Sequence, residues 1–293
     1  MTARGRVLAT ARAPTPARET WARLLRNGSA ISGLALLALV LGTTFIAPGF
    51  YPADPFDIAW RPLAPPGEAP AVPLGSDFLG RDVLAGIVHG GRATLVVGAS
   101  AAAICMIIGI AVGAASGFYG GLVDEGLMRI AEFFQVLPAL LFAMTLVSLF
   151  GPDFLTIILA IGAVSWPPIA RLARAEFLRI RELDYVRASR AIGASDLRLI
   201  WRVILPNALP SLIVAATLAV GAAILFEAGL AFLGLGDPNV VSWGLMIGAN
   251  RDFVLEAWWT VTLPGLAIFL TVLGVSLIGD GLTDALDPRR HGR

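Results

Sequence analysis

The side chains that could carry catalysis or bind a metal ion are few and far apart along the chain. All 22 basic residues are arginines, and no lysine occurs in the 293 residues. A phosphate-binding P-loop and a Schiff-base enzyme both need a lysine, which excludes these two classes. Cys105 is the sole cysteine, so no intrachain disulfide can form, and His89 and His291 have no metal-ligand spacing around them. We therefore expect this chain not to hydrolyse ATP at a Walker-type site and to hold no metal ion, with any ATP-driven work supplied by a partner.

The most strongly patterned stretch is Tyr185 to Asn207. Four side chains in it recur at helical spacing and share one face, namely Tyr185, Ala188, Ser189 and Ile192. Gly193 follows, where the end of a helix favours a residue in the left-handed conformation. Ser195 is a good N-cap for a second helix, and Pro206 limits how far that helix can continue unkinked. The pattern predicts a helix, a glycine break and another helix, lying between hydrophobic spans.

The composition indicates an all-α membrane protein that crosses the bilayer several times. Hydrophobic residues make up 57% of the chain and charged residues only 15%, far outside the usual range for soluble proteins. Apolar runs predict about six transmembrane helices, at residues 30–47, 93–115, 127–150, 153–170, 209–230 and 261–278. A cleaved signal peptide is the alternative for the first run, but its basic leader is long and Ala47-Pro48 is a poor cleavage site.

Few charged residues fall inside these spans. Arg129 and Glu132 are three residues apart, so a pair on one helix face is the simplest account, with a pore-lining role for Glu132 as the alternative. Asp77 and Asp82 precede the second span, where we expect turn formation and helix capping rather than a cation site. Within that span, Gly109, Gly113 and Gly117 recur every four residues, which predicts close helix packing.

The arginines predict the orientation in the membrane. Six spans put both termini on one side, together with the N-terminal tail and the loop at residues 171–208, and most arginines fall on that side. Only four arginines fall on the other side: Arg61, Arg81, Arg92 and Arg251. Because basic residues in short loops favour the cytoplasm, we expect both termini and the patterned loop to be cytoplasmic.

The patterned loop resembles the EAA signature of ABC-importer permeases. That signature reads Glu-Ala-Ala, a glycine after three further residues, then Ile and Leu-Pro. The matching positions here are Arg187-Ala188-Ser189, Gly193, Val203 and Leu205-Pro206. Arg187 replaces the Glu and Val203 replaces the Ile, and an arginine is familiar at the first position in the peptide-permease branch. In that family the loop docks into a groove on a cytoplasmic ATPase. The resemblance therefore implies an ATPase-coupling role for Tyr185, Arg187, Ala188, Ser189, Ile192, Gly193, Leu205 and Pro206.

Three further segments resemble the dipeptide, oligopeptide and nickel branch of these permeases. They are Leu74 to Leu95, Phe226 to Gly236 and Gly279 to Arg290, and the last two look like the C-type subunit. The resemblance covers almost the whole chain from about residue 25. It implies the type I importer fold, which is the MetI-like fold. It also implies a bacterial inner-membrane location, a second permease subunit, two ATPase subunits, and a periplasmic or lipid-anchored solute-binding protein. The chain itself would then be a translocation subunit and not an enzyme, with no catalytic residue and no cofactor, because the partner subunits bind ATP. We expect contact with membrane lipid and no binding of nucleic acid.

Together these inferences predict a domain layout. Residues 1–29 form a cytoplasmic basic tail, residues 30–47 the first span and residues 48–92 a Pro-rich periplasmic loop. Residues 93–280 form the transmembrane domain, with the coupling loop at 171–208, and residues 281–293 form a cytoplasmic tail.

The function that the resemblance implies is the import of di- or oligopeptides, driven by partner ATPases. Nickel or another small solute remains open as the substrate. A different class, a secondary transporter or channel that works alone, has only Glu132 in its favour. A membrane-embedded hydrolase is disfavoured, because the serines in or near the spans (Ser165, Ser211 and Ser276) have no partnering histidine.

Overall fold

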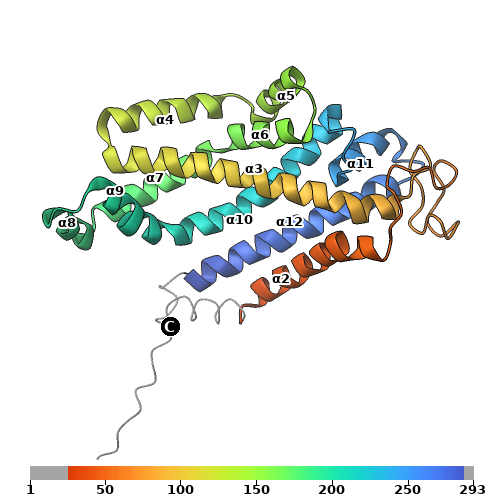
Figure 1. The fold of residues 1–293 in the computed structure, drawn as a ribbon, viewed down its shortest axis with the longest axis horizontal. Coiled ribbons are helices and arrows are strands. Elements are labelled where there is room, and N and C mark those ends of the chain that lie inside the picture. The colour runs from red at the N-terminus through yellow and green to blue at the C-terminus, as the bar shows by residue number, and fades with distance from the viewer. Residues whose placement is uncertain (1–25, 287–293) are drawn as a thin grey trace, which may run out of the picture.

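The computed structural model describes residues 26–286, and every regular element of three or more residues in that range is a helix. Figure 1 shows an elongated bundle of helices. The α-helices are α2 (Gly28–Leu41), α3 (Val83–Tyr119), α4 (Gly121–Val136), α5 (Ala139–Phe150), α6 (Phe154–Ser165), α7 (Pro167–Arg181), α8 (Asp184–Ala191), α9 (Asp196–Leu199), α10 (Leu205–Leu230), α11 (Trp243–Asn250) and α12 (Trp259–Leu286). Short π-helical segments lie at Gly42–Ile46, Ile200–Ile204 and Ala231–Leu235, and 3₁₀ turns lie at Ala47–Gly49 and Arg251–Phe253.

The described residues hold four helices that are long and apolar enough to cross a membrane. They are Gly28–Gly49, Val83–Tyr119, Asp196–Leu235 and Trp259–Ala285. Two bent pairs, α4 with α5 and α6 with α7, bring the number to as many as six. This agrees with about six predicted spans, although the helices extend well beyond the apolar runs.

The second span begins at Val83, not near Ala93 as the hydropathy pattern predicts. Asp82 is the reason, because its carboxylate accepts hydrogen bonds from the backbone N–H of Leu84 (3.0 Å) and Ala85 (3.2 Å), which caps the helix. Asp77 forms a turn by accepting from the N–H of Leu79 and of Arg81, both at 2.8 Å. The predicted turn and capping roles of both aspartates are confirmed. The resulting helix has 37 residues and is about 55 Å long, so it extends well past a hydrocarbon core of about 30 Å.

The third and fourth predicted spans are each broken. α4 and α5 meet at 85° around Pro138, where Leu137 has an extended backbone that ends α4. α6 and α7 meet at 44° around Trp166 and Pro167. Each proline lacks the N–H that a continuous helix needs. The residues at 127–150 are therefore two helices, and not one straight span.

The fifth span continues without a sharp break through Pro206. A π-helical segment at Ile200–Ile204 directly precedes the proline, and the helix runs from Asp196 to Leu235. The Asn207 side chain donates to the carbonyl oxygen of Val203 at 2.6 Å, which satisfies one carbonyl of the widened turn. The expected limit at Pro206 thus takes the form of a wider helical turn.

The glycine spacing in α3 brings α7 very close. A Cβ added to Gly109, Gly113 or Gly117 would lie 2.3–2.7 Å from the nearest atom of α7. These contacts include the carbonyl oxygen of Ala170 and the Cβ of Phe177. The predicted close packing is confirmed, and it fixes α3 against α7.

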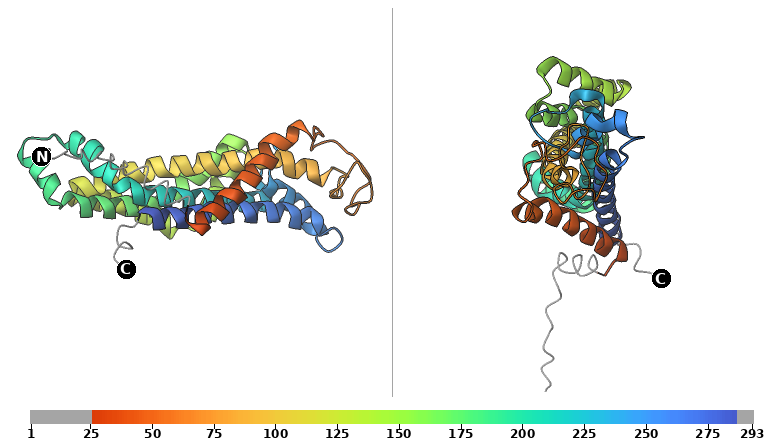
Figure 2. Two further views of the ribbon diagram at one scale, coloured as in Figure 1. Left: turned by 90° about the horizontal axis from the view of Figure 1, so that it is seen from below. Right: turned by 90° about the vertical axis from the view of Figure 1, so that its right-hand side faces the viewer.

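The bundle has two distinct ends. α8 and α9 lie at one end, beside the C-terminal end of α3, and we call this the α8 end (Figure 1). The loop at residues 50–82 lies at the opposite end (Figure 2). α2 packs along α12, where Gly33 faces Gly274. α12 continues to Leu286, so the predicted tail at 281–293 begins as helix. The rest of that tail and residues 1–25 lie outside the described part of the chain.

Candidate functional site

α8 presents the patterned face of the sequence to the outside. Val186 is buried with 1% of its surface exposed, and it packs in a cluster with Phe177 and Ile180 of α7. Away from this contact, Tyr185 is 45% exposed and Ile192 is 87% exposed. Ala188 is also exposed, and Ser189 is half-buried. The four residues expected on one face therefore lie together at the α8 end, and we call them the α8 knob.

Gly193 ends this helix in the predicted left-handed conformation, with φ of +88°. Its N–H donates to the carbonyl oxygen of Arg190 at 3.0 Å, and the N–H of Ala194 donates to that of Ser189 at 3.1 Å. These two bonds form a Schellman motif, which satisfies the last carbonyls of the helix. No atom lies within 4 Å of where a Cβ on Gly193 would be, so the position faces open space.

The chain then enters the long fifth span. Ser195 occupies the N-cap position with an extended backbone, but its side chain makes no capping hydrogen bond. Leu199 and Ile204 are fully buried in the same cluster as Val186. Leu205 and Pro206 begin α10 directly after the π-helical segment. The glycine break and the Leu-Pro pair thus flank a short element that is anchored to α7 by apolar contacts.

Arginine side chains fix α8 from its other sides. Arg187 donates to Glu182 at 2.6 Å, and hydrogen bonds from Arg187 and Arg181 hold the pKa of the Glu182 carboxylate below its usual value. The guanidinium of Arg190 lies 5.4 Å from the ring centre of Phe118, near the end of α3. The Arg187 side chain is thus turned toward Glu182, at the end of α7.

Arg129 and Glu132 lie far from this site along the chain, on α4. Their closest nitrogen and oxygen atoms are 3.8 Å apart, and the two side chains are 74% and 55% exposed. The structure therefore brings these two residues together on the outer surface of α4. It does not bring them to α8.

Comparison with known proteins decides the family. Residues 95–292 match the family described as binding-protein-dependent transport system inner membrane component. Residues 15–66 match the N-terminal transmembrane domain of oligopeptide transport permease C. This chain belongs to the binding-protein-dependent transport permeases. It is thus a multi-pass membrane protein and the permease subunit of an ABC importer.

Two relatives of this permease cover nearly its whole length. The di/tripeptide transport system permease protein DppC of Pseudomonas aeruginosa is 42% identical over 284 residues, covering 94% of this chain and 93% of that protein. The dipeptide transport system permease protein DppC of Haemophilus influenzae is 38% identical, covering 94% and 95%. Among solved structures, the fold resembles a chain of the MetNI methionine ABC transporter in an inward facing conformation. That match has a TM-score of 0.57 and 20% identity, and it covers 69% of this chain and 96% of the other. The MetI-like fold expected from the sequence is confirmed.

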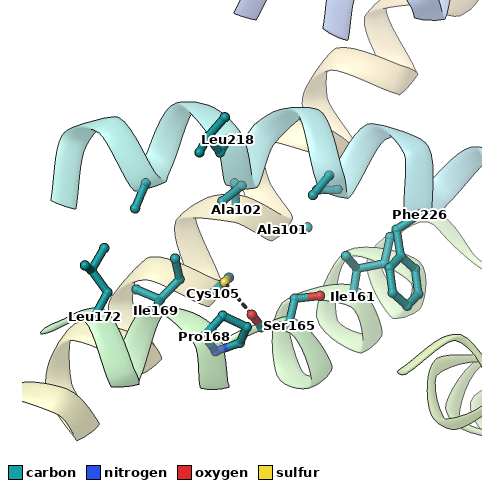
Figure 3. A pocket seen from close by; sticks show the side chains of 14 residues that line it. Ala101, Ala102, Cys105, Ile161, Ser165, Pro168, Ile169, Leu172, Leu218 and Phe226 are labelled. Atoms are coloured by element: carbon teal, nitrogen blue, oxygen red, sulfur yellow. Dashed lines mark hydrogen bonds between the residues drawn. The ribbon is translucent and has the colours of Figure 1, made fainter. Parts of the chain in front are cut away.

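One hollow in the described part of the permease is strongly apolar. About 350 Å³ of space lies between α3, α6, α7 and α10, lined mainly by alanine and aliphatic side chains (Figure 3). Cys105 lies in its wall and donates to the carbonyl oxygen of Ser165 at 3.1 Å. Among residues 26–286, no three His, Cys, Asp or Glu side chains gather where they could hold a metal ion.

Two polar contacts in the permease were missed by the sequence analysis. Arg174 of α7 forms a two-bond pair with Asp124 of α4, at 2.5 and 2.6 Å. Glu227 of α10 is buried with 3% exposed and accepts from Ser242 at 2.6 Å, while its other oxygen has no partner in the described chain. No spacing signal links Asp124 to Arg174, because they are fifty residues apart and meet only when α4 folds back on α7.

Proposed function

We propose that this permease imports peptides across a bacterial cytoplasmic membrane. In this proposal it is paired with a second permease subunit, two ATPase subunits and an external solute-binding protein. The peptide substrate is supported by the names of its relatives, a di/tripeptide permease at 42% identity and a dipeptide permease at 38%. The match of residues 15–66 to an oligopeptide permease domain supports the same substrate class. Nickel and other small solutes are the competing substrates.

The observation that carries the coupling role is the exposed face of α8. Tyr185, Ala188 and Ile192 are all exposed, although the helix is anchored from behind by the buried Val186. A short helix held in this way is suited to insert into a groove on another protein, because small side chains allow close approach of its backbone. We propose that this groove lies on the ATPase.

The proposed layout places the α8 end inside the cell. The excess of arginines at residues 171–208 supports this orientation, since basic loops favour the cytoplasm. The position of the loop at residues 50–82 at the opposite end of the bundle supports its placement outside (Figure 2). In the same layout residues 1–29 and 281–293 are the two cytoplasmic tails, and residues 93–280 form the transporting domain.

The proposed mechanism is rigid-body coupling. Closure of the ATPases on ATP moves the groove, and α8 moves with it. α7 and α10 tilt because Val186 packs on α7 and because Gly193 and Leu205-Pro206 join α8 to α10. ATP drives the outward-open arrangement only if the ATP-bound partners bind that arrangement more tightly than the inward one.

The test is a bulky substitution at Gly193. We expect Gly193→Trp to insert normally but to abolish peptide uptake and transport-coupled ATP hydrolysis, because the indole would project into the open space that the partner needs. Uptake of a labelled dipeptide into proteoliposomes holding the full importer measures the first effect, and phosphate release measures the second.

Gly193→Ala is the matched control. It carries the same cost of a positive φ without the bulk, so we expect it to keep most of the uptake. Near-normal uptake by Gly193→Trp would contradict the coupling role. Nickel uptake in place of dipeptide uptake by the wild-type importer would contradict the proposed substrate. Uptake by the isolated permease without an ATPase would indicate instead a transporter that works alone.

A further inference from the structure

Four polar side chains from three helices meet at the α8 end, and no part of the coupling role assigned above uses the ion pair at their centre. Arg174 of α7 donates from Nε and Nη2 to the two oxygens of Asp124 on α4, at 2.5 and 2.6 Å. The hydroxyl of Ser116 on α3 donates to the same carboxylate. Arg181, at the end of α7, donates to the carbonyl oxygens of Gly117 (2.9 Å) and Phe118 (3.1 Å). We call Ser116, Asp124, Arg174 and Arg181 the three-helix cluster.

The pair at its centre has the geometry of a fixed contact. Two parallel N–H to oxygen bonds between a guanidinium and a carboxylate restrict orientation as well as distance. The Asp124 side chain is 19% exposed and that of Arg174 is 35% exposed, so water competes less than at the surface. Ser116 is fully buried, and Arg181 satisfies carbonyls in the last turn of α3. The cluster therefore joins α3, α4 and α7 at one point.

α4 depends on this pair more than its neighbours do. α3 and α7 are already held together at Gly109, Gly113 and Gly117, which we call the glycine stripe. There the two helices are too close to slide past each other. Ala131 is the single buried side chain of α4, while Leu122, Phe133 and Val136 are each more than 60% exposed. Phe134 adds an edge contact with Trp166, at 5.4 Å between ring centres. Met128, Ala131 and Phe134 of α4 pack in one apolar cluster with Ile169 and Ala170 of α7. At the α8 end the two-bond pair is the polar side-chain link between α4 and α7.

The same cluster borders α8. Arg190 of α8 stacks on the ring of Phe118, and Arg181 donates to the carbonyl oxygen of the same Phe118. Val186 of α8 packs on Phe177 and Ile180 of α7. α8 is consequently joined to the bundle by two routes. One route is the chain itself, through Gly193 into α10, and the other is a set of contacts through α7.

We propose that Asp124 and Arg174 are positioning residues for coupling, which make α3, α4 and α7 move as one body when α8 is displaced. This inference rests on the proposed coupling role of α8. Without the pair, α7 still follows α8, but α4 no longer follows α7, and part of the motion is lost before it reaches the transport path. ATP is then hydrolysed without a matching opening of the transport path.

The experiment measures peptide imported per ATP hydrolysed in proteoliposomes that hold the full importer. We expect Asp124→Asn to lower this ratio about tenfold, within the range for residues that carry coupling between sites. The inserted amount of permease and the amount of copurified ATPase should stay within about twofold of wild type. The charge-reversed double variant Asp124→Arg with Arg174→Asp should recover much of the ratio, because it restores an ion pair between the same two helices.

Arg179→Gln is the matched control. It also removes a guanidinium from α7, but Arg179 pairs with Glu176 on the same helix and is 62% exposed. We expect its ratio to equal that of wild type. A purely structural role of Asp124 would reduce inserted protein, uptake and ATP hydrolysis together and leave the ratio unchanged, and that outcome would overturn the proposal.

Gly193→Trp, run in parallel, separates the two hypotheses. If Gly193→Trp abolishes uptake while Asp124→Asn keeps a normal ratio, the positioning role is wrong and the coupling role of α8 stands. If Gly193→Trp transports normally, the coupling role itself is wrong, whatever the result at Asp124.

Discussion

At the scale of single residues, backbone conformation sets where helices begin and end, and close packing sets which helices touch. Gly193 adopts a positive φ that ends α8, and Asp82 caps α3 with two hydrogen bonds. Gly113 serves a different purpose, since its lack of a Cβ lets the backbone of α7 approach. A glycine in this chain can therefore be required because its φ is positive or because a neighbouring helix leaves no room for a Cβ. Substitution has different effects in the two cases.

Gly113→Ala tests the packing role. The added Cβ would lie 2.3 Å from the carbonyl oxygen of Ala170, which is backbone and cannot move aside alone. We expect a loss of about 1–3 kcal/mol in the free energy of unfolding, as is usual for overpacked sites. The measurement is the thermal or denaturant unfolding of the purified protein in detergent.

Gly126→Ala on α4 is the control for this substitution. No atom lies within 4 Å of its Cβ position, so helix propensity alone should act and stabilise by about 0.5–1 kcal/mol. Equal effects of the two substitutions, in sign and size, would show that α3 and α7 do not approach as closely as described here.

At the scale of elements, helix pairs rather than single helices make up the bundle. α3 lies on α7 along the glycine stripe, and α2 lies on α12 through Gly33 and Gly274. The bends at Pro138 and at Trp166-Pro167 allow one chain segment to contact two neighbours in different directions. The α8 knob depends on this arrangement, because Val186 needs α7 as a surface to pack on.

A disulfide between α2 and α12 tests their pairing. A Cβ on Gly274 would lie 3.2 Å from the Cβ of Leu36, close to the separation of about 3.5–4.5 Å that a disulfide needs. In a chain with Cys105→Ala, we expect Leu36→Cys with Gly274→Cys to cross-link on mild oxidation. A shift in gel mobility that reductant reverses is the measurement.

Leu41→Cys with Gly274→Cys is the negative control for that pair. Leu41 is 45% exposed and lies on another side of α2, further along the helix. Cross-linking of this pair with equal efficiency, or failure of the Leu36 pair, would contradict the α2–α12 register.

At the scale of the whole molecule, the two ends of the bundle differ in charge and shape. One end carries the α8 knob and the three-helix cluster, and the other carries the loop at residues 50–82 with α11 (Figure 1). α3 is long enough to extend beyond the hydrocarbon core, so groups at these ends can meet water-soluble partners. In the proposed function, solute enters at the end with the loop, and the ATPases act on the α8 end.

Labelling of engineered cysteines tests the orientation. Ala71 in the loop and Ala191 on α8 are both exposed alanines, which makes them a matched pair. In a Cys105→Ala background, we expect a membrane-impermeant maleimide to label Ala71→Cys in spheroplasts. Ala191→Cys should react only after the membrane is permeabilised. The reverse pattern would put α8 outside the cell and end the coupling hypothesis.

The sequence by itself determined the features that depend on neighbours along the chain. Hydropathy placed about six apolar runs, and helical spacing placed Tyr185, Ala188, Ser189 and Ile192 on one face. The glycine at 193 predicted the left-handed helix end, which the structure confirms with a φ of +88°. These features follow from local hydrogen bonding and side-chain period, which need no knowledge of the distant chain.

Only the tertiary structure decided which helices meet and at what angle. The 85° bend between α4 and α5 was not predicted, since a proline permits a bend but packing sets its size. The pairing of Asp124 with Arg174 and the burial of Glu227 were also missed. Such contacts join residues far apart in sequence, and they form only because closing the bundle removes polar groups from water and makes an unpaired charge costly.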